Sequence, residues 1–227
     1  EAVDFVEKFG KDLGLETIRD EVGNVIIKKP ATPGYENKKT VVMQGHLDMV
    51  PQKNSDKDFD FEKDPIETKI EGDVVKANGT TLGADNGMGV AAAMAVLEAK
   101  DLEHGPVEAL FTVDEETGMT GANELKPGLL DAEILINMDS EDEGELYIGC
   151  AGGLETNAFF HYKEESLPAD VAAFNIEVKG LKGGHSGLDI HLGRGNANKV
   201  LNRILWYAIQ NLDVRLAKID AGSLRNA

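Results

Sequence analysis

The sequence lacks several features that would assign it to common classes of protein. Cys150 is its only cysteine, which excludes an intrachain disulfide and a zinc site built from cysteines. The lack of disulfides fits a reducing compartment, so we expect a cytoplasmic protein, although secreted proteins without disulfides also exist. No apolar run is long enough to cross a membrane and no signal peptide is visible, so we expect no membrane partner.

Positive charge is also scarce. The chain has 23 Lys and Arg against 41 Asp and Glu, a formal net charge of −18. This balance argues against nucleic acid or an anionic membrane surface as a partner. It is compatible with surplus carboxylates that gather around cations, although most acidic side chains in any protein are solvated at the surface.

Apolar residues make up 41% of the chain, enough for a sizeable core in one large or two small domains. Their spacing predicts the elements of the first part of the chain. These are a helix at 2–14, strands at 17–19, 24–28, 40–43, 73–77, 107–113 and 134–138, a surface loop at 51–72, and a helix at 86–100 buried on nearly every side. Strands that alternate with helices favour an α/β fold with a mostly parallel sheet.

The pattern of apolar and polar residues changes near residue 153. Segments 155–162 and 172–178 alternate between apolar and polar residues, as half-buried antiparallel strands do. A glycine-rich loop, a helix at 196–211 and a strand at 214–219 follow. We therefore expect two domains, at 1–153 and 154–227.

The most informative run follows the apolar segment 40–43, which predicts a buried strand. His46 and Asp48 stand two residues apart at its end, and such positions point to the same side of extended backbone. This short pattern is common by chance, so its meaning depends on the segments that accompany it.

Three further acidic segments accompany it. Asp85 opens the predicted helix at 86–100, the pair Glu115 and Glu116 follows the strand at 107–113, and Asp139 follows the strand at 134–138. In open sheets with parallel strands, ligands bind beyond the carboxyl ends of the strands. The coincidence points to a metal-assisted hydrolase.

Imidazole and carboxylate side chains suit a pair of divalent ions. We assign His46, Asp85, Glu116 and Asp139 as the ligands. Asp85 lies among glycines and suits a carboxylate that bridges two ions. Asp48 is predicted to hydrogen-bond the nitrogen of His46 that does not bind metal, which fixes the tautomer of the imidazole.

Glu115 and Glu116 are adjacent, so both reach one site only if the strand ends before them, as the following Thr117-Gly118 indicates. One glutamate then binds metal while the other moves a proton from the attacking water to the leaving amine. We assign Glu115 as this general base and Glu116 as the ligand.

Each of these residues has a plainer interpretation when it is taken alone. Asp85 would serve as the N-cap of the helix that follows it. The glutamate pair would form a solvated turn, and His46 and Asp139 would be ordinary residues at strand ends. We prefer the metal interpretation because the plainer ones do not explain why all these positions coincide in one sheet order.

A second group of candidates lies after residue 180. His185 lies in a Gly-Gly-His-Ser-Gly run, which allows close approach of a ligand, and it either contacts substrate or is a surface histidine. Arg194 and Asn196 are candidates for binding a substrate carboxylate.

Taken in order, the four acidic segments resemble the co-catalytic zinc peptidases and deacylases, which include carnosinases and aminoacylases. Segments 147–153, 179–187, 193–199 and 224–227 narrow the resemblance to bacterial aminoacyl-histidine dipeptidases. The resemblance implies an incomplete metallopeptidase catalytic domain followed by the first part of an α+β lid domain, which would form a homodimer. It also implies hydrolysis of Xaa-His dipeptides by a metal-bridged hydroxide, with Glu115 as the base.

The resemblance further implies two divalent ions, zinc by preference, with cobalt or manganese possible. One ion would be held by His46, Asp85 and Asp139, and the other by Asp85, Glu116 and a histidine far toward the C-terminus. His185 would correspond to a lid histidine that helps to hold the substrate.

The sequence departs from this pattern because no histidine follows His191. We therefore expect an N-terminal piece of a longer enzyme, with its own activity in doubt. Alternatives are a deacylase or aminotripeptidase of the same family, or a non-catalytic metal-binding scaffold. A two-metal phosphatase or nuclease is disfavoured by the acidic balance.

Overall fold

The chain is described here from a computed structural model, which covers residues 1–54, 56–140, 142, 144–150, 152, 154, 156–183 and 189–222. The chain divides into two compact units, Glu1–Gly153 and Leu154–Ala227, and each is described by itself. Within the residues covered, no helix has the length and apolar character needed to cross a membrane.

The first unit is built on a five-stranded sheet with the strand order β1-β2-β6-β3-β7. Its strands are β1 (Glu16–Arg19), β2 (Val25–Lys29), β3 (Val41–His46), β6 (Val107–Thr112) and β7 (Ile134–Asn137). β3 pairs in parallel with both β6 and β7, whereas β2 pairs antiparallel with β1 and β6. The α/β class is confirmed, and the sheet is mixed, with its parallel strands on one side.

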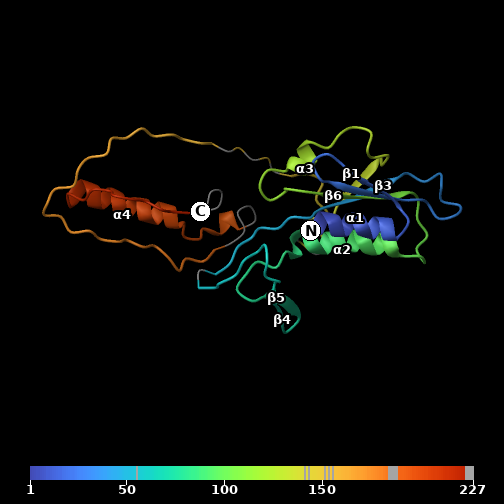
Figure 1. The fold of residues 1–227 in the computed structure, drawn as a ribbon, viewed down its shortest axis with the longest axis horizontal. Helices are drawn as coiled ribbons and strands as arrows, with labels where there is room; N and C mark the ends of the chain where they lie inside the picture. Colours follow the sequence, from blue (N-terminus) through green and yellow to red (C-terminus); the bar gives the residue numbers. More distant parts are fainter. Residues whose placement is uncertain are drawn as a thin grey trace. The chain divides into compact units, whose positions relative to one another are not determined.

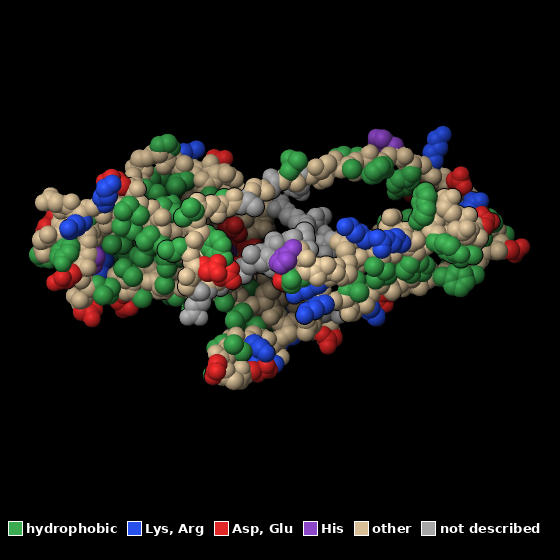
Figure 2. All heavy atoms as spheres, turned by 180° about the vertical axis from the view of Figure 1, so that it is seen from behind, with side chains coloured by type: hydrophobic (Ala, Val, Ile, Leu, Met, Phe, Trp, Pro, Cys, Tyr) green, Lys and Arg blue, Asp and Glu red, His purple; other side chains and the backbone are tan. Residues whose placement is uncertain are grey.

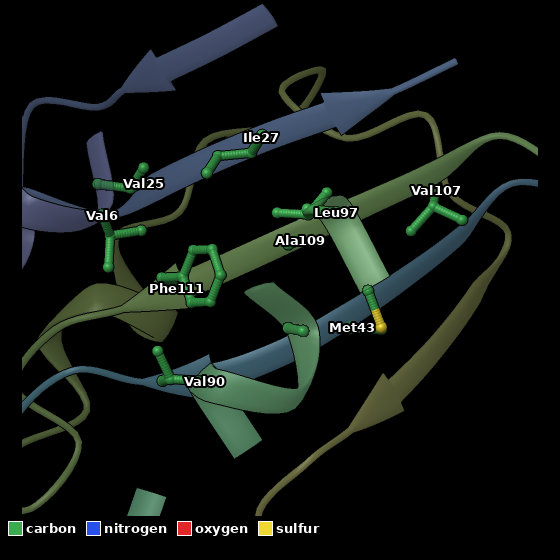
Figure 3. Packing of buried hydrophobic residues seen from close by; sticks show 10 residues of the cluster. Val6, Val25, Ile27, Met43, Val90, Leu97, Val107, Ala109 and Phe111 are labelled. Atoms are coloured by element: carbon green, nitrogen blue, oxygen red, sulfur yellow. The ribbon is translucent and has the colours of Figure 1, made fainter. Parts of the chain in front are cut away.

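Two helices cover one face of this sheet. α1 (Ala2–Asp12) and α2 (Ala84–Glu98) lie side by side against it (Figure 1). Val6 from α1, together with Val90 and Leu97 from α2, belongs to the cluster that includes Met43 and Phe111 of the sheet (Figure 3). Burial of these side chains is the main favourable contribution to holding the helices in place.

The opposite face carries a smaller cluster. Ile26, Val42 and Leu110 are buried there under the segment that follows the short helix α3 (Thr120–Asn123). That segment contributes Leu125, Leu129, Leu130 and Ala132. The side chains of β3 therefore alternate between two covered faces, as expected for a strand inside an α/β sheet.

α2 is less buried than the sequence predicts. Its buried residues recur at helical spacing along one side, and they are Asn86, Gly89, Val90, Ala93 and Leu97. The other side is exposed, and Met88 is 70% exposed. Small apolar residues occur on both sides of this helix, so the sequence predicts that both sides are buried. The sequence does not show which side contacts the sheet.

The segment predicted as a surface loop at 51–72 contains a strand. β4 (Thr68–Glu71) pairs antiparallel with β5 (Val74–Ala77), joined by a turn in which Gly72 has a φ of +62°. Ile70 and Val75 on this hairpin are exposed. The strand lacks a buried face, so it lacks the alternation by which a sequence reveals a strand.

The second unit contains the 3₁₀ helix η1 (Ile190–Leu192) and α4 (Ala197–Asn211), which begins one residue after its predicted start. The strands predicted at 155–162, 172–178 and 214–219 are absent from the described part of these segments. A strand needs a neighbouring backbone to pair with, and no described segment pairs with them. Their apolar residues stay exposed, Phe159 and Phe174 among them, and Figure 2 shows hydrophobic side chains at the surface along this unit.

Gly10 allows α1 to lie close to the sheet, and its replacement tests this packing. An alanine Cβ there would overlap Thr17 Oγ1 and lie 2.8 Å from Ile27 Cδ1. Overpacking costs about 1–3 kcal/mol, whereas alanine gains about 1 kcal/mol over glycine inside a helix. We expect Gly10→Ala to lower the free energy of unfolding, measured by urea denaturation.

The matched control is Gly87→Ala in α2, where an added Cβ meets open space. This variant should lose no stability. Equal unfolding free energies for the two alanine variants would contradict the close packing of α1.

Candidate metal centre

The candidate ligands lie at one edge of the sheet in the first unit. His46 is the last residue of β3, and Asp139 follows β7 by two residues. Glu115 and Glu116 follow β6, and Asp85 lies in the first turn of α2. Because β3, β6 and β7 run in parallel, their carboxyl ends meet at this edge.

The first group of ligands consists of His46, Asp85 and Asp139, which each offer one ligand atom within 4.8 Å of the others. His46 Nε2 lies 3.0 Å from Asp85 Oδ1 and 3.7 Å from Asp139 Oδ1. Tetrahedral zinc with ligands at about 2.0–2.1 Å places neighbouring ligand atoms roughly 3.3 Å apart. The two separations bracket this value, so the geometry fits a divalent ion.

A second group shares the same imidazole. His46, Glu115 and Glu116 also offer ligand atoms within 4.8 Å of one another. Both glutamates reach the site because β6 ends at Thr112 and the chain turns at Asp114, whose φ is +57°. The Asp114 carboxylate accepts hydrogen bonds from the Thr117 and Thr120 hydroxyls, which fixes this turn.

Asp85 and Asn86 interrupt the start of α2, because neither has helical backbone angles. The backbone of Asp85 is extended, with φ −85° and ψ 109°, although the helix continues after it. Its carboxylate lies beside the imidazole of His46. The N-cap interpretation does not by itself account for this position of the carboxylate.

Asp48 supports the site differently from our prediction. His46 Nδ1 lies 2.9 Å from the backbone carbonyl oxygen of Asp48 and 3.5 Å from its carboxylate. The carbonyl is thus the hydrogen-bond acceptor that orients the imidazole and leaves Nε2 toward Asp85. The Asp48 carboxylate instead accepts hydrogen bonds from the backbone N–H groups of Glu115, at 3.1 Å, and Glu116, at 3.0 Å.

The crowding of acids changes the proton affinities of the centre. Burial, followed by the hydrogen bond and charge of Asp85, raises the pKa of Asp139 to about 7. Burial and the charges of Asp85 and Glu115 raise the pKa of Glu116. Burial acts to lower the pKa of His46, but the hydrogen bond that its imidazole donates to Asp85 and the charges of Asp139 and Asp48 outweigh burial and raise that pKa.

Two buried asparagines near the centre were not among the residues predicted from the sequence. Asn24, which is fully buried, donates to the carbonyl of Gly121 at 2.9 Å and accepts from the Val113 N–H at 3.2 Å. It therefore ties the start of β2 to both ends of the loop that carries Glu115 and Glu116. The second is Asn86, which directly follows Asp85 in the sequence, a position that could have drawn attention to it.

The candidates in the second unit make local contacts. Arg194 Nη1 donates to the Gly183 carbonyl at 2.6 Å and pairs with Asp189 at 2.7 Å. Asn196 is the N-cap of α4 and accepts from the Lys199 N–H at 2.9 Å. His185 lies outside the described residues. The part of these three residues in substrate binding stays a prediction.

Comparison with known proteins assigns the family. The model of peptidase family M20/M25/M40 matches residues 42–216, which include all the candidate ligands. The chain belongs to this family.

The chain is 54% identical over 224 residues to the cytosol non-specific dipeptidase of Escherichia coli K12, covering 99% of this chain and 46% of that protein. It is 49% identical to the crystal structure of an aminoacylhistidine dipeptidase from Vibrio alginolyticus, with a TM-score of 0.64 and the same coverages. The aminopeptidase PepT of Bacillus cereus is 28% identical, with a TM-score of 0.51 over 61% of this chain and 37% of that one. The chain thus spans about half the length of the first two relatives.

The raised pKa values predict that metal affinity depends on pH. Above pH 7 Asp139 is ionised and ready to bind a cation, whereas below it a proton must first be displaced. The raised pKa of His46 acts in the same direction. We expect the affinity for Co²⁺, measured by calorimetric titration, to fall on acidification by up to about tenfold per pH unit for each proton displaced.

Asp139→Asn serves as the control for this titration. It should bind Co²⁺ more weakly but with a shallower dependence on pH, because one displaceable proton is gone. An unchanged slope in this variant would mean that Asp139 does not titrate with metal binding.

Proposed function

We propose that this chain is part of a metal-dependent dipeptidase. The observation that carries the proposal is that two overlapping ligand groups share His46, while the strand end beside them brings two adjacent glutamates to the same centre. A single ion does not need both glutamates as ligands. One is therefore free for proton transfer, as hydrolysis of a peptide bond requires.

The donor set suits two divalent ions. One would be held by His46, Asp85 and Asp139, and the other by Asp85 and Glu116 together with a ligand from outside this sequence. Zinc is our first choice for an imidazole and carboxylate site, with cobalt or manganese as alternatives. When bound, the ions would polarise the peptide carbonyl and lower the pKa of the attacking water.

Glu115 is the residue that we propose as general base. Its backbone N–H is held by the Asp48 carboxylate, and so is that of Glu116, so the two glutamates are fixed relative to His46. With Glu116 as a ligand, the carboxylate of Glu115 would take the proton of the attacking water and deliver it to the amine that leaves.

The substrate class that we propose is the unprotected dipeptide with a C-terminal histidine, as in carnosine. The name of the Vibrio relative supports histidine at this position, and the name of the Escherichia coli relative supports a dipeptide and a cytosolic location. The residues from 154 onward would belong to a lid domain, and that domain would form a homodimer. His185, Arg194 and Asn196 would contact the substrate from there.

Other activities of the same family are the main alternative. A structural neighbour from Staphylococcus aureus is described as a tripeptidase, at 25% identity and a TM-score of 0.50. A deacylase or an aminotripeptidase would use the same centre on a different substrate. A metal-binding scaffold without catalysis is the remaining alternative.

The role of Glu115 is tested by Glu115→Gln in the protein extended to the length of its relatives. Loss of the base should lower kcat for β-alanyl-histidine by about 10²–10⁴-fold. Metal stoichiometry should stay unchanged, because Glu115 is not a ligand. The control is Glu133→Gln, an exposed glutamate paired with Lys39, which should keep full activity. Retention of most turnover in Glu115→Gln would refute the assignment.

A substrate panel tests the dipeptidase proposal itself. The extended protein should hydrolyse Xaa-His dipeptides faster than tripeptides or N-acyl amino acids, measured by release of free amine. Faster hydrolysis of tripeptides or acylated substrates would favour the other activities of the family. No hydrolysis of any substrate by the metal-loaded protein would favour the scaffold.

A further inference from the structure

One buried amide connects the three segments that carry the first group of ligands. Asn86 is only 4% exposed. Its Oδ1 accepts from the backbone N–H of His46 at 3.2 Å, and its Nδ2 donates to the carbonyl of Met138 at 2.9 Å. Asn86 follows Asp85 along the chain, and Met138 precedes Asp139. The contacts thus link the ends of β3 and β7 to the start of α2.

The surrounding packing leaves room for this amide and for little else. A Cβ added at Gly45 would overlap Asn86 Oδ1. A Cβ added at Gly89 would lie 2.8 Å from both Asn86 Nδ2 and Oδ1 and would overlap the Met138 carbonyl oxygen. Glycines therefore lie at the two positions where the Asn86 amide approaches the backbone of β3 and α2.

The chemistry of the contacts calls for an amide. One terminal group must accept from an N–H and donate to a carbonyl at the same time, which a primary amide does and a carboxylate does not. The amide is also uncharged, so it adds no repulsion among the neighbouring carboxylates. An apolar replacement would leave the His46 N–H and the Met138 carbonyl without these partners, at a cost of about 1–3 kcal/mol each where they are buried.

We propose that Asn86 is a positioning residue that sets the spacing of His46, Asp85 and Asp139 for a divalent cation. This inference rests on the metal centre proposed above. It adds to that proposal a residue that neither binds the cation nor touches the substrate. Groups that orient metal ligands typically change metal affinity by about 10–100-fold when they are removed.

The test is a calorimetric titration of Co²⁺ into the 227-residue chain and its variants, with urea unfolding of each metal-free protein. Asn86→Leu removes both hydrogen bonds while filling the space, and Asn86→Ala removes them and leaves a space. Both variants should bind Co²⁺ about 10–100-fold more weakly than the wild type. Agreement between them assigns the loss to the hydrogen bonds rather than to side-chain volume.

Glu108→Gln is the matched control for a purely structural loss. Glu108 is 2% exposed on β6, pairs with Lys28 at 3.2 Å and accepts from the Asp131 N–H at 3.0 Å. It lies four residues before Thr112, the partner of His46 in the sheet. Its replacement should lower the free energy of unfolding while the affinity for Co²⁺ stays at the wild-type value.

Wild-type affinity in either Asn86 variant would overturn the positioning role, while the metal centre would stand. His46→Ala separates the two proposals, because it removes a ligand outright. If the wild type binds no Co²⁺, or His46→Ala binds it equally well, the metal centre itself is wrong and the role of Asn86 falls with it.

Discussion

The parallel pairing of β3 with its two neighbours is the constraint on which the candidate centre depends. The register places His46 opposite Thr112 of β6 and Gln44 opposite Asn137 of β7. The residues that follow β6 and β7 therefore emerge beside the end of β3, and short side chains such as Asp139 reach the imidazole. A slip of β3 by one residue would turn His46 to the opposite face of the sheet, and no ligand group would form.

This arrangement brings together more negative charge than a metal-free protein tolerates easily. Burial, together with the charges of the neighbouring acids, raises the pKa values of Asp139 and Glu116, so each group resists ionisation. The carboxylates remain together because their backbone segments are held by groups other than the ligands. Asp48 holds the loop after β6, and Asn86 holds the ends of β3 and β7. A divalent cation would offset the remaining repulsion.

Much of this centre could be predicted from the sequence, because its reactive residues stand next to strong local signals. Apolar runs fix the ends of β3, β6 and β7, and acids directly after such runs emerge at one edge if the strands are parallel. The positions of Asp139 and of the glutamate pair beside His46 follow from this rule, whereas Asp85 opens a helix and is not placed by it. The role of Asp48 could not be predicted in the same way. Its backbone carbonyl and its carboxylate both lie near the imidazole of His46, and only the folded structure shows which of them is the closer acceptor.

The contacts of the supporting residues could not be predicted, for a physical reason that applies to both buried asparagines. Asn24 contacts Gly121, 97 positions away, and Asn86 contacts Met138, 52 positions away. Neither contact leaves a periodic or compositional mark, since each depends on how distant segments meet after folding. The two amides are neutral, so a search for charged side chains does not find them. A neutral group suits this position because another carboxylate would add to the repulsion at the centre. Residues that fix a crowded anionic site are therefore the ones that a search for reactive side chains overlooks.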